Sequence, residues 1–230
     1  MSFDRRTLMQ NLAGISALAP FLSLERAMAA VAPPTVEDAM IRAAEAHGAL
    51  MAVPGMRMHA GETVSMLLYP GFTAMDLVGP HYFFASMMGA KVQLVSNQPN
   101  LDPVKSDLGL AIAPTARLGD AFETPTILFA PGGGAGTVAA MDDPATIEYL
   151  RDRGGRASYV TSVCTGSLLL GAAGLLKGRK ATSHWAARDV LPEFGATPVD
   201  ARVVTDGNVI TGAGVSAGLD FGLAMVEKLR

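Results

Sequence analysis

The chain has 230 residues, of which 50% are hydrophobic and 17% are charged, so it is long enough to bury one sizeable core and is not a disordered polypeptide. Its formal net charge of -3 gives no broad basic surface, which argues against DNA or RNA as a partner. We expect one main domain with no nucleic-acid partner.

The first thirty residues have the pattern of a twin-arginine export signal. Arg5 and Arg6 precede an uncharged stretch from Asn11 to Leu24, and the small residues of Ala27-Met28-Ala29 suit a signal peptidase. The stretch is shorter than the ~20 residues of a membrane-spanning helix. We therefore predict a periplasmic protein with no membrane partner after export. The alternative is an amphipathic helix of the mature fold, which would leave the protein cytoplasmic.

The domain boundaries follow from this pattern. Residues 1–30 form the signal, residues 31–61 a linker with one short helix from Val36 to His47, and residues 62–230 the main domain.

Apolar runs typical of buried strands alternate with helical spacing along the main domain. We expect strands at 63–69, 91–96, 126–130 and 158–163, a hairpin around 108–113, and short strands at 180–182, 203–204 and 209–211. The expected helices cover 77–88, 144–154, 166–173, 185–191 and 216–228. This alternation predicts an α/β fold, a flavodoxin-like doubly wound and mostly parallel sheet with helices on both faces.

Three segments with unusual chemistry follow predicted strands. They are Asp76, the glycines of 132–134, and Cys164. Ligands of such folds bind beyond the carboxyl ends of the strands. We therefore expect these three segments to meet in one site.

Cys164 is the only cysteine, so it is either a small buried hydrophobe or a functional thiol. It stands between small residues, in Thr161-Ser162-Val163-Cys164-Thr165-Gly166-Ser167, where a strand has to reverse into a helix. This is the sequence context of a nucleophile elbow. The N-terminus of the following helix is expected to stabilise the thiolate and to lower the pKa of the thiol.

The glycines after the 126–130 strand let backbone N–H groups approach a ligand. We expect the N–H groups of Gly133 and Thr165 to stabilise an anion, with Gly132 beside them; a flexible turn is the alternative. The run lacks the Lys-Ser/Thr ending of a phosphate loop and the spacing of a dinucleotide motif, so it predicts neither of these two sites.

Asp76 is the single acid of the apolar stretch 72–80. It either caps the following helix or stands beside the thiol, where burial would raise its pKa and make it a proton donor. His184 is either a structural residue or close to the sulfur. The remaining histidines have no metal-ligand spacing with one another or with Cys164, so we predict no metal.

Several segments together resemble the ThiJ/PfpI superfamily. They are, in order, Tyr69-Pro70-Gly71-Phe72 with Asp76-Leu77-Val78-Gly79-Pro80, Ala130-Pro131-Gly132-Gly133, Val160 to Ser167, Ala181-Thr182-Ser183-His184-Trp185 and Thr211 to Gly218. The resemblance covers about residues 62 to 230. It implies a homodimer that needs no cofactor.

Within the superfamily, the chain is most similar to the isonitrile hydratase branch. Protease-like members carry histidine directly after the cysteine, where this chain has Thr165, and many relatives have glutamate where it has Asp76. The resemblance implies that Cys164 attacks the terminal carbon of an isonitrile. Asp76 then acts as acid and base, Thr165 as the neighbour of the thiol, and the backbone of Gly133 helps form the site.

Two alternatives stay open from sequence. One is a periplasmic redox sensor or stress-protective protein whose thiol is oxidised reversibly. The other is hydrolysis of glyoxal adducts or of peptides, for which His184 would have to serve as the base because no histidine follows Cys164 directly.

Overall fold

A computed structural model describes residues 35–52 and 61–230 of the chain. The chain divides into two compact units, Met1–Pro54 and Gly55–Arg230. The first unit contains helix α3 (Val36–Met51), which matches the helix predicted from Val36 and continues past His47. Thr35 and Asp38 cap its N-terminus reciprocally through side chains and backbone. The predicted export signal lies outside the described residues and stays a prediction.

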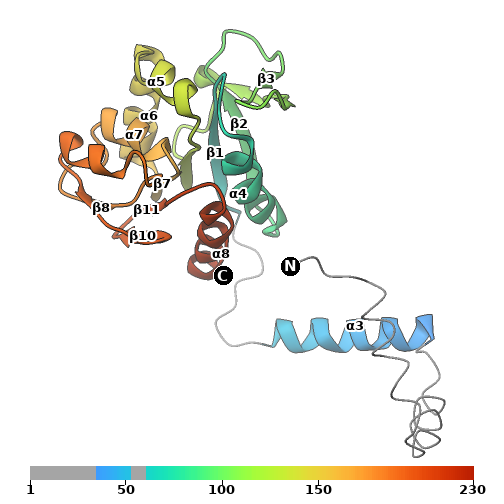
Figure 1. The fold of residues 1–230 in the computed structure, drawn as a ribbon. Helices are drawn as coiled ribbons and strands as arrows, with labels where there is room; N and C mark the ends of the chain where they lie inside the picture. The colour runs from blue at the N-terminus through green and yellow to red at the C-terminus, as the bar shows by residue number, and fades with distance from the viewer. Residues whose placement is uncertain (1–34, 53–60) are drawn as a thin grey trace, which may run out of the picture. The chain divides into compact units, whose positions relative to one another are not determined.

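The second unit is built on a seven-stranded sheet with the order β10-β11-β7-β6-β1-β2-β5 (Figure 1). All neighbouring strands run parallel except β10 and β11, which pair antiparallel. The strands are β1 (Thr63–Leu68), β2 (Lys91–Ser96), β5 (Ala116–Arg117), β6 (Ile127–Ala130), β7 (Tyr159–Val163), β10 (Val203–Asp206) and β11 (Val209–Gly212). The interior position of β1, between β6 and β2, explains its continuous apolar sequence, because helices cover both faces of a parallel sheet.

Helices cover both faces of the sheet. Helices α4 (Ala74–Ser86) and α8 (Ala217–Leu229) pack side by side, and α5 (Gly134–Met141), α6 (Pro144–Arg156) and α7 (Gly166–Ala172) form a second group (Figure 1). The predicted α/β architecture is therefore confirmed. No helix among residues 35–52 and 61–230 combines the length and hydrophobicity that crossing a bilayer requires.

Three aromatic rings hold the α4 and α8 layer to the sheet. Phe84 of α4, Phe129 of β6 and Phe221 of α8 are fully buried, with ring centroids 5.6 to 6.2 Å apart. Such pairs stabilise a core beyond the area they bury. This cluster fixes α4, whose first turn carries Asp76, against the strand that leads to the glycine run.

Some elements differ from their predictions. The glycine run does not end in a turn, because α5 begins at Gly134. The predicted 185–191 helix is a 3-10 helix, η2 (Arg188–Phe194), which contains Pro192; proline removes a helical N–H donor. The predicted hairpin pairs β3 (Val104–Lys105) with β4 (Ala111–Ile112), and the predicted 180–182 strand is β8 (Lys180–Ala181), which pairs with β9 (Thr197–Pro198) outside the main sheet. A further 3-10 helix, η1 (Leu118–Asp120), follows β5.

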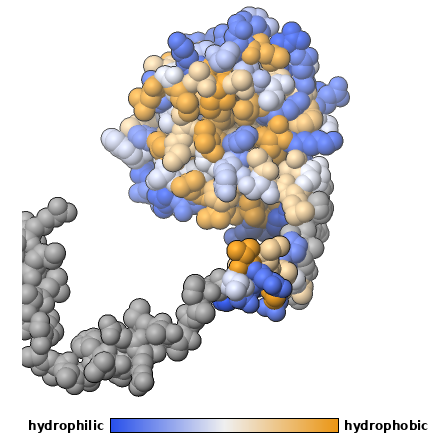
Figure 2. All heavy atoms as spheres, turned by 90° about the vertical axis from the view of Figure 1, so that its right-hand side faces the viewer, coloured by the Kyte–Doolittle hydropathy of each residue, from blue (hydrophilic) through white to orange (hydrophobic). Residues whose placement is uncertain are grey.

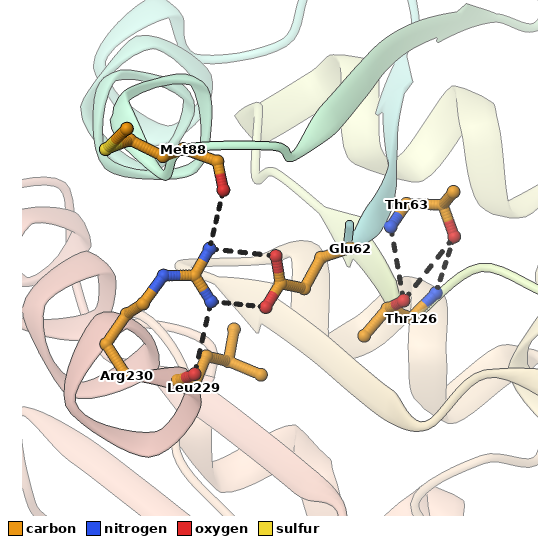
Figure 3. Close-up of polar contacts among 6 residues, drawn as sticks. All are labelled: Glu62, Thr63, Met88, Thr126, Leu229 and Arg230. Atoms are coloured by element: carbon orange, nitrogen blue, oxygen red, sulfur yellow. Dashed lines mark hydrogen bonds and ion pairs between the residues drawn. The ribbon is translucent and has the colours of Figure 1, made fainter. Parts of the chain in front are cut away.

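A buried ion pair joins the start of β1 to the end of α8. The guanidinium of Arg230 bonds both carboxylate oxygens of Glu62 and donates to the carbonyls of Met88 and Leu229 (Figure 3). The two side chains are only 10% and 5% exposed. The Arg230 guanidinium lowers the pKa of Glu62, so this stabilisation is present near neutral pH and is lost as the pH falls through the lowered pKa of the carboxyl group.

Removing one partner leaves a charge without compensation. We expect Glu62→Ala to lower the free energy of unfolding by about 2 kcal/mol, less than for a fully enclosed pair, because Arg230 ends the helix and can turn to water. Urea denaturation near neutral pH measures this. In Asp120→Ala, which breaks the exposed Arg117–Asp120 pair, the change should stay within about 0.5 kcal/mol. Equal losses in the two variants would contradict the assignment.

Candidate active site

Cys164 occupies the turn between β7 and α7 in a strained conformation. Its φ of 58° lies in the left-handed region, and it is the one residue other than glycine with positive φ among the described residues. Such a conformation costs on the order of 1–3 kcal/mol in a residue with a side chain. The predicted nucleophile-elbow geometry is therefore present.

Three hydrogen bonds and one close contact hold this turn. The Cys164 N–H donates to the Gly212 carbonyl of β11 at 3.0 Å. The hydroxyls of Ser167 and Ser183 both donate to the Cys164 carbonyl, at 3.2 and 3.1 Å. Gly166 packs so closely on β6 that a Cβ there would lie 2.1 Å from the Ala130 carbonyl oxygen. The surrounding backbone thus fixes the strained residue from several elements.

Asp76 lies in the first turn of α4 and is fully buried. Its Oδ2 accepts the Gly132 N–H at 3.1 Å, whereas Oδ1 has no hydrogen-bond partner within the described part of the chain. Burial is the main reason that its pKa rises from 3.8 to about 6, and the nearby Asp107 adds to the rise. Asp76 caps no N–H of its own helix, so the sequence alternative of a proton-handling carboxyl group fits better than that of a cap.

Gly132 lies between Asp76 and the residue after the cysteine. A Cβ at this position would lie 2.7 Å from the backbone N and from Oγ1 of Thr165, and 2.8 Å from Asp76 Oδ2. No side chain fits there without moving one of these groups. The glycine therefore lets the ends of β1, β6 and β7 converge.

The thiol is not activated in the way that the sequence suggests. Burial, and then the negative charge of Asp76, raise the pKa of Cys164 to about 12. The Thr165 N–H does lower the pKa, but by less. The expected lowering of the thiol pKa is wrong, because desolvation of the thiolate and the charge of Asp76 outweigh the hydrogen bonds from Thr165 at the start of α7. At neutral pH the site therefore holds a protonated thiol beside a carboxylate.

Cys164 and Thr165 open into a cleft of about 520 Å³. Its walls come from the start of α4, the β3–β4 hairpin and the loop after β11, with the lining residues Thr73, Ala74, Met75, Asp107, Leu108, Gly134, His184 and Val215. Most of this lining is apolar, and Asp107 is its one carboxylate. The cleft has the size and polarity of a small-molecule site.

The remaining predicted residues are placed as follows. His184 lines the same cleft, half-buried, and its Nδ1 accepts the Ala186 N–H at 3.3 Å. The Gly133 N–H donates to Thr165 Oγ1 at 3.0 Å, so it holds a hydroxyl rather than facing the cleft. Among residues 35–52 and 61–230, no three His, Cys, Asp or Glu side chains gather as metal ligands would.

The sequence predicts no role in the site for three further residues. Tyr69, at the end of β1, and Thr137, in α5, extend a buried hydroxyl chain from Thr165. Asp107 is held over the cleft by the Thr73 hydroxyl at 2.7 Å. Tyr69 reads as one more apolar strand residue, and Asp107 and Thr137 as ordinary polar residues of a loop and a turn, so only their places in the fold reveal them.

Comparisons with known proteins agree with this geometry. Residues 62–228 match the model of the DJ-1/PfpI family. The chain belongs to the DJ-1/PfpI family. The isonitrile hydratase of Pseudomonas putida is 46% identical over 166 residues, which cover 72% of this chain and 71% of the relative. A glutathione-independent glyoxalase of Caenorhabditis elegans, DJR-1.2, is 30% identical over 60% of this chain and 74% of its own length.

A solved structure extends the likeness to three dimensions. A ThiJ/PfpI family protein of Pseudomonas syringae is 56% identical, with a TM-score of 0.73 over 78% of each chain. Named DJ-1/PfpI relatives thus differ in reaction, which leaves the chemistry of this member to be argued from its own site.

Asp76 makes the stability of this DJ-1/PfpI domain depend on pH. Its folded pKa of about 6 lies above the ordinary 3.8, so the native state takes up a proton that the unfolded state does not as the pH falls through 6. From about pH 7.5 to about pH 5, we expect wild type to gain about 1 kcal/mol of stability that Asp76→Asn does not gain.

Denaturation with urea at both pH values gives this difference, and Asp120→Asn, at an exposed site, serves as the control that should follow wild type. Parallel pH profiles of wild type and Asp76→Asn would show that Asp76 does not titrate as described.

Proposed function

We propose that this protein hydrates an isonitrile to an N-substituted formamide. The observation that carries the proposal is the buried Asp76 carboxyl group, with one oxygen unpartnered, beside a protonated thiol held in a left-handed turn. An isonitrile carbon accepts both a nucleophile and a proton. Cys164 lines the cleft and Asp76 lies behind it, within hydrogen-bond reach of the thiol, and the 46% identity to an isonitrile hydratase supports the same reaction.

In the first step, the Cys164 sulfur bonds to the terminal carbon of R–N≡C. Asp76 takes the thiol proton and delivers it to the same carbon, so the product is a thioimidate, R–N=CH–S–Cys164. The carboxylate suits this transfer because burial brings its pKa to about 6, closer to that of the thiol than an ordinary aspartate. No cofactor enters this step.

In the second step, water adds to the thioimidate carbon. Asp76 accepts one proton of the water and passes it to the nitrogen, which gives the tetrahedral adduct R–NH–CH(OH)–S–Cys164. The carbon–sulfur bond then breaks while the hydroxyl proton of the adduct passes through Asp76 to the sulfur, so R–NH–CHO leaves and both side chains return to their starting states. Thr165 stands next to the sulfur, where its N–H reaches the thiolate as it is expelled.

The other readings fit the site less well. A redox sensor needs a thiolate, because oxidation follows thiolate character, and the raised pKa of Cys164 keeps the thiol protonated. A hydrolase needs a base beside the sulfur. His184 does line the cleft, which makes a glyoxalase reaction the second candidate, in line with the relative DJR-1.2.

Turnover separates these candidates. Purified protein should convert an alkyl or aryl isonitrile to the formamide, followed by chromatography, and Cys164→Ser and Asp76→Asn should each lose about 100-fold or more in kcat. Since the carboxylate form accepts the thiol proton, kcat/KM should fall as the pH drops below about 6.

His184→Ala should reduce hydration by less than either of these variants, because no step uses its imidazole. Turnover of a 2-oxoaldehyde that needs His184, with no formamide from any isonitrile, would replace hydration by the glyoxalase reaction.

We also propose that the protein works as a homodimer, as its family resemblance implies. Exposed apolar side chains follow the outer faces of the packed helices α4 and α8, with Met75, Val78 and Tyr82 on the first and Leu219 and Leu223 on the second. Figure 2 shows a broad group of hydrophobic residues on the side of the domain where α4 lies in Figure 1. Because Met75 also lines the cleft, a second copy on this face would border the site.

A charge on this face should separate the copies. Wild type should sediment as a dimer at micromolar concentration, and Leu223→Asp as a monomer, because an aspartate in an apolar contact is costly to bury. Leu101→Asp, at an equally exposed leucine away from both helices, is the matched control and should stay dimeric. A monomeric wild type would refute the proposal.

A further inference from the structure

Three hydroxyl groups form a chain that ends beside Cys164. Tyr69 Oη lies 3.0 Å from Thr137 Oγ1, which lies 2.8 Å from Thr165 Oγ1. Tyr69 and Thr137 are 0% and 1% exposed, so water does not compete for these contacts. The proposed reaction uses neither residue.

Counting protons gives the chain a direction. A carbonyl oxygen can only accept a hydrogen bond, so the Tyr69 hydroxyl donates its proton to the Pro131 carbonyl at 2.9 Å. In the contact between Tyr69 and Thr137, the Thr137 hydroxyl must then be the donor and Tyr69 Oη the acceptor. In the contact between Thr137 and Thr165, the Thr165 hydroxyl must be the donor and Thr137 Oγ1 the acceptor. Each hydroxyl therefore donates away from the cysteine.

A fourth contact fixes the other side of Thr165. The Gly133 N–H donates to Thr165 Oγ1 at 3.0 Å, which occupies one lone pair. With its proton given to Thr137, the oxygen keeps one lone pair, and Thr165 is one of the residues that line the cleft. A chain of donors that all point one way also strengthens the first oxygen as an acceptor.

We propose that Thr137, held by Tyr69, is a positioning residue that keeps the Thr165 hydroxyl proton turned away from the Cys164 sulfur and presents Thr165 Oγ1 to the reacting atoms as a hydrogen-bond acceptor. In the hydration step this acceptor orients the attacking water toward the thioimidate carbon. That kinetic part rests on the proposed function. The orientation of the hydroxyl itself does not.

Breaking the chain has a consequence that lost packing alone does not have. In Thr137→Val, the Thr165 proton loses its acceptor and turns to the sulfur, where a donor stabilises the thiolate and lowers the pKa of the thiol. In Tyr69→Phe, the Thr137 hydroxyl loses its acceptor and can donate to Thr165 Oγ1 instead. The Thr165 hydroxyl then no longer donates to Thr137, and its proton can turn to the sulfur as in Thr137→Val. Both variants should make the thiol more reactive while they slow hydration.

The test is the rate of alkylation by iodoacetamide between about pH 8 and pH 10, where the rate follows the small thiolate fraction. Cys164 is the only cysteine, so the protein gives one signal. Thr137→Val and Tyr69→Phe should react about threefold or more faster than wild type at each pH, which corresponds to a pKa lower by about half a unit. Thr137→Ser, which keeps the hydroxyl, should match wild type.

Steady-state kinetics with the isonitrile supply the second readout. The two chain-breaking variants should lower kcat and leave KM within about twofold, because the substrate still enters the same cleft. If wild type hydrates no isonitrile, the proposed function fails, and the alkylation rates still decide the hydroxyl orientation. Alkylation of both variants at or below the wild-type rate would overturn the inference. Thr137→Ser behaving like Thr137→Val would overturn it too.

Discussion

The left-handed turn at Cys164 is the constraint on which the site depends. A residue with a side chain adopts this conformation only where its surroundings compensate for the strain, and here β11, two serine hydroxyls and the contact of Gly166 with β6 do so. The turn places the buried Cys164 beside Asp76, which follows β1, and in the wall of the cleft. The rest of the site is arranged around that point.

Desolvation is the main cause of the unusual pKa values at the site. Burial raises the pKa of both Asp76 and Cys164, and their closeness keeps the thiol protonated when the carboxyl group ionises. A pair of this kind suits the proposed transfer of a proton from sulfur to a substrate atom, whereas a free thiolate would be open to oxidants. The cleft is apolar and Asp107 is its one carboxylate, so it suits a neutral substrate. Such a substrate needs one atom that can bond to the sulfur and accept the proton.

The fold was largely predictable from sequence, and the site only in part. Runs such as 63–69 and 158–163 predict buried strands because parallel strands are apolar on both faces, and their ends place Asp76 and Cys164 at one edge of the sheet. The sign of the Cys164 pKa shift was not predictable in this way. It depends on burial by segments distant in sequence, and so do the partners of Thr165, since hydrogen bonds across 28 to 68 residues leave no local pattern.

The strand order has a consequence for how the chain folds. β1 lies between β2 and β6, and β7 lies between β6 and β11, so the groups that line the site come together only after pairings of high sequence separation have formed. Non-local pairing of parallel strands is slow compared with local helix formation. The burial of the single thiol therefore depends on a strand far along the chain, because the Cys164 N–H donates to the Gly212 carbonyl of β11, and any event that opens β11 from β7 also loosens the turn that holds the sulfur.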